Sequence, residues 1–246
     1  MQATFHTHSS MDIALEQPPT AEDRRRLRRL PLFTGASDTT VQDILARTPV
    51  STVPRHQLAV REGAVPSSII AVVSGRLALS TQMPGEQPVV IGIVGREGLV
   101  MPGAAIAAVP YPLSARAVEE TRVAVIPLSD LWAAAEADSG FAIDLARLAS
   151  SEWQALLATL KDYRLRSAPQ RFAAHLVRLA KMEGRMDGGP AEIELADDRK
   201  TLASLLGMTP ENLSRTIAQF RERGVIVSGR QVNIADLSAL ADFADV

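Results

Sequence analysis

The chain has 246 residues, 46% of them hydrophobic, and its formal net charge is −2 at pH 7. This length and hydrophobic content predict one or two globular domains, and the small net charge gives no general attraction for nucleic acid. The sequence lacks cysteine, which excludes disulfides, iron–sulphur clusters and thiolate metal sites. It also contains no apolar run long enough to span a bilayer and no secretory signal pattern, so we expect a cytoplasmic protein without a membrane partner.

The N-terminal region combines a predicted tail with a basic run. Residues 1–22 are polar and weakly patterned and are expected to form a flexible tail. A short helix with five arginines follows: Arg24, Arg25, Arg26, Arg28 and Arg29. Such a run is either a nucleic-acid or partner patch or, more commonly, a solvated helix face. A second helix is expected over Asp38–Ala46.

Short β-branched runs alternate with turns between residues 52 and 127. The expected strands are Gln57–Val60, Ile69–Val73, Leu77–Ser80, Val89–Val94, Ala115–Val118 and Val123–Ile126. Many short strands at regular spacing predict a small antiparallel barrel or sandwich. Such a barrel either encloses a small ligand or is filled by its own side chains.

A long helix is predicted over residues 139–165. One apolar stripe along it contains Leu145, Ala149, Trp153, Leu156 and Leu160, at spacings of three and four. This spacing is close to that of a coiled-coil seam and favours self-association into a homodimer. A second stripe with Leu148 and Leu157 is expected to pack on the barrel. The alternative is that the whole helix packs on its own barrel.

The segment Arg199–Phe220 predicts two short helices joined by a tight turn. Apolar residues recur at helical spacing on both sides of the turn, at Leu202, Leu205, Leu206, Leu213 and Ile217. Asp198 is expected to cap the first helix, Gly207 to end it and Thr209 to cap the second. This is the spacing of a helix-turn-helix, or of an ordinary surface pair of helices.

The second helix of this pair keeps a polar face. It carries Glu211, Asn212, Ser214, Arg215 and Gln219, which are groups that contact base edges or phosphates. Two strands follow, Gly224–Val227 and Gln231–Ile234, and predict a wing with Arg230 at its tip, placed to meet a phosphate. The wing favours a winged helix-turn-helix over an ordinary pair of helices.

Barrel, long helix and winged helix, in this order, resemble the CRP/FNR family of bacterial transcription regulators from about Arg26 onward. The residues that carry the resemblance are Leu30–Phe33, Arg61–Gly63, Val72–Gly75 and Arg166–Leu179. The resemblance implies an α+β fold. It comprises an N-terminal antiparallel β-roll of the cyclic-nucleotide-binding type over residues 23–138, a dimerisation helix over 139–165 and a winged helix-turn-helix over 166–246.

The FNR-like branch of this family uses a Glu-x-x-Ser-Arg run to read the half-site TTGAT, and this chain has the complete run from Glu211 to Arg215. The resemblance therefore implies base contacts by Glu211, Ser214 and Arg215. Contacts to phosphates are expected from Arg199, Thr209, Asn212 and Arg230. The implied partners are double-stranded DNA, a second copy of the chain and RNA polymerase.

The barrel departs from the pattern of the members that bind cyclic AMP. Tyr111 and its neighbours stand where those members have an Arg-Ser-Ala run that neutralises the cyclic phosphate. A buried phosphate without its guanidinium would leave an uncompensated charge, so we expect an effector other than cyclic AMP, or none. The candidate effector pocket contains Glu97, Leu99, Met101, Ile106 and Tyr111. The cofactor remains unknown.

Besides an architectural DNA binder without a switch, two alternatives remain open. One is a haem-based gas sensor of the same family, but Met101 stands where the carbon monoxide sensor has its haem ligand, and no histidine lies near. The other is an enzyme with a cupin-like barrel and an accessory DNA-binding domain. The sequence has no HExxH, P-loop or GxSxG motif, so we expect neither an enzyme nor a metal site.

Overall fold

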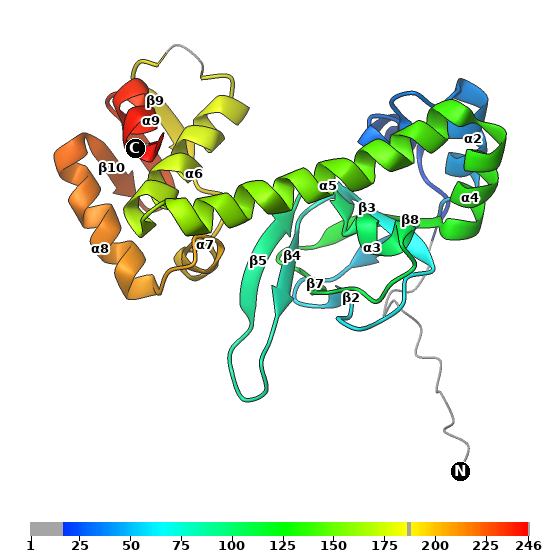
Figure 1. Ribbon diagram of the computed structural model, residues 1–246, viewed down its shortest axis with the longest axis horizontal. Coiled ribbons are helices and arrows are strands. Elements are labelled where there is room, and N and C mark those ends of the chain that lie inside the picture. Colours follow the sequence, from blue (N-terminus) through cyan, green and yellow to red (C-terminus); the bar gives the residue numbers. More distant parts are fainter. Residues whose placement is uncertain (1–16, 186–187, 246) are drawn as a thin grey trace. The chain divides into compact units, whose positions relative to one another are not determined.

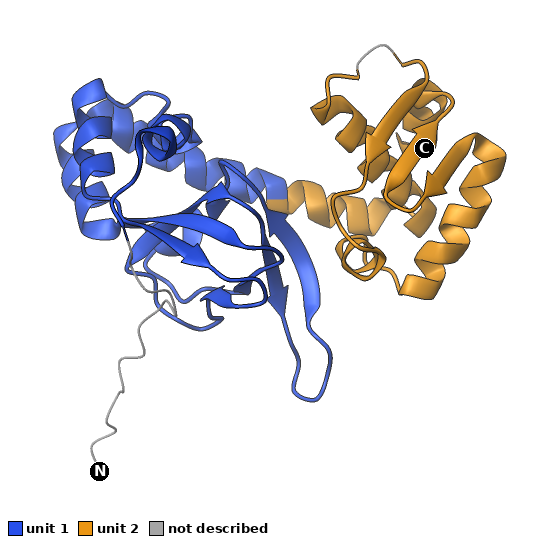
Figure 2. Ribbon diagram, turned by 180° about the vertical axis from the view of Figure 1, so that it is seen from behind, with its two compact units in different colours: residues 1–155 blue, residues 156–246 orange. Residues whose placement is uncertain are grey.

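The structure, a computed structural model, describes residues 17–185 and 188–245. The chain divides into two compact units, residues 1–155 and 156–246 (Figure 2). One unbroken helix, α5 (Ser139–Leu165), contributes residues to both (Figure 1). No helix of the described residues is long and apolar enough to cross a membrane.

Unit 1 contains two antiparallel sheets of four strands, in the orders β1-β8-β3-β6 and β2-β7-β4-β5. The strands are β1 (Val50–Val53), β2 (Leu58–Val60), β3 (Ser68–Ser74), β4 (Leu77–Thr81), β5 (Val89–Val94), β6 (Leu99–Val100), β7 (Ser114–Ala117) and β8 (Thr121–Pro127). This arrangement confirms the predicted antiparallel β-roll. Sequence reasoning missed β1, which lies between two prolines, and β6, which is too short to show a period.

Strand β3 is buried on both faces, one against the helices and the other against the second sheet. Ile69, Ala71 and Val73 point into an apolar cluster with the helices, whereas Ile70 and Val72 point into a second cluster between the sheets. Because side chains alternate along a strand, a strand that is buried on both faces must be apolar throughout.

Six helical segments accompany the sheets of unit 1 among its described residues, 17–155. They are α1 (Ala21–Leu27), the 3₁₀ turn η1 (Pro31–Phe33), α2 (Asp38–Ala46), α3 (Pro102–Ile106), α4 (Leu128–Ala137) and the first turns of α5. Most of the predicted tail, residues 1–16, lies outside the described residues. Its described end is structured, since Gln17 pairs with Val50 and Thr20 caps α1.

Asp138 joins the starts of two helices. Its carboxylate accepts hydrogen bonds from the backbone N–H of Ser37 at 2.9 Å, the hydroxyl of Thr40 at 2.7 Å and the N–H of Phe141 at 3.2 Å. These bonds hold the pKa of Asp138 well below its ordinary value, and the N–H of Ser37 has the largest effect. One carboxylate thus satisfies donors at the beginnings of both α2 and α5.

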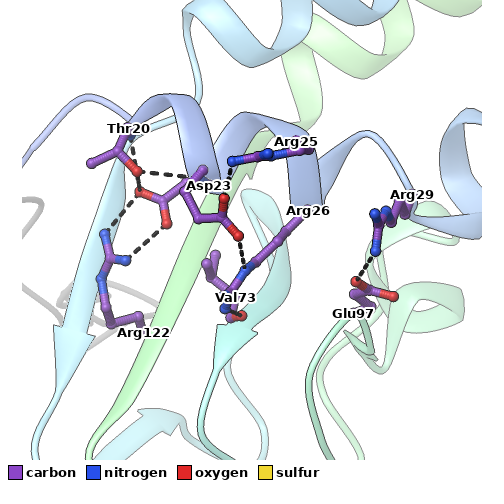
Figure 3. A network of polar contacts seen from close by, with 9 residues as sticks. Thr20, Asp23, Arg25, Arg26, Arg29, Val73, Glu97 and Arg122 are labelled. Atoms are coloured by element: carbon purple, nitrogen blue, oxygen red, sulfur yellow. Dashed lines mark hydrogen bonds and ion pairs between the residues drawn. The ribbon is translucent and has the colours of Figure 1, made fainter.

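Helix α1 is fixed to the β-roll by a polar network (Figure 3). The buried carboxylate of Asp23 receives two hydrogen bonds from Arg122, at 2.8 and 2.9 Å, and one from the Thr20 hydroxyl at 2.7 Å. Arg26 donates to the carbonyl of Val73 at 3.4 Å. Part of the basic run is therefore engaged with the barrel rather than with solvent.

The apolar stripe of α5 begins inside unit 1. Leu145 and Leu148 are buried, and they belong to the same cluster as Ile44 of α2 and Leu131 of α4. Leu148 packs within the unit, as expected. Leu145 was predicted in the dimer seam, but its side chain is buried within unit 1, because α2 and α4 pack against the first turns of α5 and cover it.

The second half of α5 leaves large apolar side chains uncovered. Trp153 is 62% exposed, Leu156 59% and Leu160 55%, while Ala149 is half-buried. Leu157 was expected against the barrel and is 41% exposed instead. The exposed stripe therefore starts later along α5 than the spacing alone suggests.

Unit 2 is a winged helix built from α6 (Ala168–Met182), β9 (Ala191–Glu194), α7 (Arg199–Leu205), α8 (Pro210–Phe220), η2 (Arg221–Arg223), β10 (Val225–Ser228), β11 (Gln231–Ile234) and α9 (Leu237–Asp245). Phe220 is central to its core and packs edge-to-face on Phe172 and Phe243, with ring centroids 5.2 and 5.7 Å away. The predicted pair of wing strands gains β9, in the order β10-β11-β9.

The contact between Asp23 and Arg122 makes stability depend on pH. Burial of Asp23 raises the pKa of its carboxyl, but the hydrogen bonds from Arg122 and Thr20 outweigh burial and lower it. We expect Asp23→Asn to lower the free energy of unfolding by about 2–4 kcal/mol at neutral pH. Because the folded-state pKa is depressed, this contribution is complete above about pH 4 and is lost as the pH falls further.

Urea unfolding of the parent and of Asp23→Asn, at neutral pH and at about pH 3, measures both effects. The control is Glu22→Gln on the same helix, whose carboxylate pairs with Arg25 and Arg26 at the surface and contributes little. A difference between parent and Asp23→Asn that is equal at both pH values would contradict this role of the pair.

Candidate nucleic-acid interface

The helix pair α7–α8 is held by a cap at each helix start and by the left-handed turn between them. Asp198 accepts a hydrogen bond from the N–H of Thr201 at 2.8 Å at the start of α7. Gly207 follows α7 with φ +62°, a conformation that residues with a side chain rarely adopt. Thr209 then caps α8 through the N–H of Asn212 at 3.2 Å. The predicted caps and turn are confirmed.

Helix α8 has one buried face and one exposed face. Its inner face consists of Leu213, Thr216, Ile217 and Phe220. Glu211 is exposed, and so are Ser214 and Arg215, which lie three and four residues after it. Residues at these spacings are neighbours on a helix surface, so the three predicted base-contacting side chains share one solvent-facing patch.

Glu211 is prepared to act as a hydrogen-bond acceptor. Its own backbone N–H, the Thr209 hydroxyl and the charge of Arg215 lower the pKa of the Glu211 carboxyl. The side chain is therefore ionised at neutral pH. Arg215 supplies planar guanidinium donors beside it, so acceptor and donor lie on the same patch.

Two other predicted contacts are partly occupied within the helix. The hydroxyl of Ser214 donates to the carbonyl of Pro210 at 2.9 Å, which leaves its lone pairs to accept. The hydroxyl of Thr209 accepts from the backbone of Asn212, whose side chain is half-buried. Thr209 and Asn212 therefore shape the start of α8 in addition to any phosphate contact.

Two cations occupy the wrong end of α7 for helix stability. Arg199 and Lys200 are exposed in its first turn, where the helix dipole favours negative charge. A cation pair at a helix N-terminus stabilises the helix poorly but is well placed to receive an anion such as a phosphate. Lys200 was not among the predicted contacts.

Arg230 lies in the turn between β10 and β11, as predicted. Its guanidinium donates to the carbonyl of Ala196, and its own carbonyl accepts from the N–H of Leu195 at 2.8 Å. Arg230 therefore ties the wing to the segment between β9 and α7, and its remaining N–H groups stay available to a phosphate.

Sequence reasoning missed two residues outside the motif that hold its turn. Tyr163 of α5 donates to the carbonyl of Leu205 at 3.1 Å, and Arg171 of α6 donates to that of Leu206 at 2.8 Å. Contacts to backbone carbonyls leave no pattern in the sequence. The one signal in the sequence was Arg171, a charged residue beside the apolar face of the helix that became α6.

The five candidate effector residues lie in different parts of unit 1. Leu99 and Ile106 pack against the cluster shared with the helices, whereas Met101 and Tyr111 belong to the cluster between the sheets. Glu97 faces Arg29 at 3.9 Å, in the network beside α1 (Figure 3). These positions serve the packing of the barrel and its attachment to the helices.

Tyr111 fills part of the barrel itself. Its side chain is buried, and its hydroxyl donates to the carbonyl of Ser68 at 3.2 Å. Burial raises the pKa of Tyr111 to about 12, so the phenol stays neutral. Among the residues that the structure describes, no group of three or more histidine, aspartate or glutamate side chains could hold a metal ion.

Two domain families match the sequence. Residues 50–138 match the cyclic nucleotide-binding domain, and residues 170–243 match the Crp-like helix-turn-helix domain. These matches cover the β-roll with α4 and most of the winged helix.

Individual relatives agree with these matches. The nitrogen fixation regulation protein FixK of Azorhizobium caulinodans is 35% identical over 133 residues, which are 53% of this chain and 54% of that protein. The anaerobic regulatory protein of Haemophilus influenzae is 28% identical over 185 residues, 75% of this chain and 67% of that protein. The match to FixK thus spans about half of that relative's length.

The fold also agrees with a solved structure. FixK2 from Bradyrhizobium japonicum superposes with a TM-score of 0.70 at 18% identity, over 81% of this chain and 98% of that one. At this low sequence identity, the superposition shows a shared fold and nothing about function. With both domain families in the predicted order and these relatives, the chain belongs to the CRP/FNR family of transcription regulators rather than to a family of enzymes.

Proposed function

We propose that this protein is a homodimeric transcription regulator that binds DNA through α8 and reads a TTGAT-type palindrome. The observation that carries the proposal is the exposed patch of Glu211, Ser214 and Arg215 on a helix whose opposite face is anchored in the core. A rigid helix with polar side chains on one face is the form in which proteins read the major groove.

The chemistry of the patch fits such a half-site. Arg215 can donate two hydrogen bonds to O6 and N7 of a guanine, and ionised Glu211 can accept from N4 of a cytosine. The hydroxyl of Ser214 keeps its accepting capacity and can meet a base edge or a phosphate. Each of the three side chains thus has a complementary hydrogen-bond partner in such a half-site.

Phosphate contacts would add affinity without sequence preference. Arg199 and Lys200 at the start of α7 and Arg230 in the wing are the cationic candidates, and Thr209 and Asn212 are the neutral ones. Since the chain has no net positive charge, these local cations carry the electrostatic attraction. Binding should therefore weaken steeply as salt rises.

The exposed stripe on α5 supports a homodimer. Trp153, Leu156 and Leu160 are each more than half exposed, a costly arrangement for large apolar side chains unless another surface covers them. A second copy of α5 offers the same stripe and the same spacing. Two copies around a two-fold axis would place their recognition helices about 34 Å apart, one turn of DNA.

The sensor part of the function involves an effector other than cyclic AMP, or none. Tyr111 occupies barrel space with its own neutral ring, and the candidate effector residues pack into different clusters. This chain cannot hold a cysteine-bound iron–sulphur cluster, because its sequence has no cysteine. Contact with RNA polymerase is part of the same proposal.

We expect Arg215→Ala to reduce affinity for a duplex with two TTGAT half-sites by about 1–3 kcal/mol per half-site and to relax the choice of base at one position in each. The cause is the loss of both donors to one guanine in each half-site. Fluorescence anisotropy against the parent duplex and against single-base variants of each half-site measures affinity and preference together.

The matched control is Arg199→Ala, which removes a cation from α7 and no base contact. It should weaken binding to all duplexes alike and reduce the slope of affinity against salt by about two, one for each protomer of the dimer. An Arg215→Ala protein with unchanged base preference would contradict the assignment of Arg215.

The proposed seam has its own test. We expect the double substitution Leu156→Glu with Leu160→Glu to convert the dimer to a monomer, because four carboxylates would meet across the seam. Sedimentation equilibrium measures the mass. Met182→Glu on α6 is the control, since Met182 is 78% exposed and lies outside α5. Unchanged dimers in the double variant would place the interface elsewhere.

A further inference from the structure

The turn of the helix-turn-helix is held from outside the motif at three consecutive carbonyl groups. Tyr163 donates its hydroxyl proton to the carbonyl of Leu205 at 3.1 Å. Arg171 donates to the carbonyl of Leu206 at 2.8 Å and to that of Gly207 at 3.4 Å. Carbonyls at a helix C-terminus have no partner within the helix and carry the negative end of its dipole. A cation and a hydroxyl from two other helices therefore satisfy the end of α7.

The two side chains also support each other. The guanidinium carbon of Arg171 lies 5.2 Å from the centre of the Tyr163 ring, a distance at which a cation is attracted to an aromatic face. Arg171 also donates to the carbonyl of Arg166 at 2.8 Å, at the corner between α5 and α6. We call the pair of Tyr163 and Arg171 the turn clamp.

Gly207 fits closely against the clamp. A Cβ atom at this position would lie 2.4 Å from a ring carbon of Tyr163, which is closer than such atoms approach one another in proteins. The glycine thus serves twice, through its positive φ and through the absence of a side chain beside the ring. The turn before α8 therefore lies directly against the ring of Tyr163 in the last turns of α5.

We propose that Tyr163 and Arg171 are positioning residues that fix the orientation of α8 relative to the end of α5. The inference rests on the proposed function, because a fixed orientation matters if α8 reads DNA and α5 forms the dimer seam. A helix held in place before binding loses less conformational entropy on binding. The clamp therefore raises DNA affinity without touching DNA.

A distance measurement tests the clamp independently of DNA binding. The chain has no cysteine, so Lys161→Cys and Gln219→Cys, both exposed, introduce one spin label on α5 and one on α8. Labelled protein diluted in excess unlabelled protein reports the distance within one chain by pulsed electron paramagnetic resonance. We expect a narrow distribution in the parent and a broader one after Tyr163→Phe or Arg171→Gln.

Affinity for the palindromic duplex supplies the second measurement. We expect Tyr163→Phe to weaken binding roughly fivefold and Arg171→Gln roughly 10- to 100-fold, the fold-changes that a neutral and a charged set of hydrogen bonds are worth. The control is Arg178→Gln on the same helix, whose guanidinium contacts the ring of His175 at 3.0 Å and no part of the turn. It should leave both the distance distribution and the affinity unchanged.

Gly207→Ala examines the ring contact by a double-mutant comparison. The strain of a positive φ is the same whether or not the ring is present. The substitution should therefore broaden the distance distribution more in the parent than in a Tyr163→Ala background. Equal broadening in both backgrounds would rule out the ring as the element that sets the turn.

The outcomes separate the clamp from the proposed function. A distribution that stays narrow in both Tyr163→Phe and Arg171→Gln overturns the clamp, whatever the DNA affinity. Broader distributions in the two variants, together with a parent protein that binds no palindromic duplex, keep the clamp and overturn the function. Broader distributions with weakened binding, at an unfolding midpoint in urea close to that of Arg178→Gln, support positioning over a merely structural role.

Discussion

The angle between α7 and α8 depends on a single backbone position, Gly207, which must turn left-handed where a neighbouring ring leaves no space for a side chain. A recognition helix is useful only if its exposed face is presented at a defined angle. In this chain the angle is set by the turn itself, by the apolar faces of both helices and by the carbonyls that Tyr163 and Arg171 hold. The exposed patch on α8 can then consist of side chains that contribute little to folding, which leaves them free for a ligand.

The polar contacts of the two units hold different features in place. In unit 1 the buried carboxylate of Asp23 and the double cap at Asp138 join helices to the β-roll and to each other. In unit 2 the contacts of Tyr163 and Arg171 hold the helix-turn-helix, and those of Arg166 join the end of α5 to α9. Arg199 and Lys200 differ from these stabilising contacts, because they lie at the start of α7, where the helix dipole disfavours positive charge. Charges that oppose stability are expected where a protein meets an anion, and this pair falls beside the patch on α8.

Much of this architecture could be predicted from the sequence because local patterns determine it. The caps at Asp198 and Thr209, the glycine between them and the leucine spacing specify the helix pair, and alternating β-branched runs specify most strands. The two-residue strand β6 is too short to show a period, β1 lies between two prolines, and β9 contains a single β-branched residue. The helix α9 lies beyond the motif that guided the prediction.

The remaining differences come from tertiary contacts. Leu145 has the same spacing as Leu156, but only the structure shows that a cluster of helical side chains buries it. Likewise, the basic run reads as one patch in the sequence, whereas Arg26 and Arg29 contact the barrel. Tyr163 and Arg171 act through backbone carbonyls, which any sequence offers. Residues 1–16 lie outside the described part of the chain.

The central claim is that two copies of α8 read a palindrome, and selection from a random duplex library tests it most directly. Full-length protein is mixed with duplexes that carry a randomised segment, and the bound fraction is amplified and sequenced over several rounds. The account predicts enrichment of inverted TTGAT-type half-sites with centres about one helical turn apart. Enrichment of a single unpaired half-site, of an unrelated sequence, or of no sequence at all would contradict it.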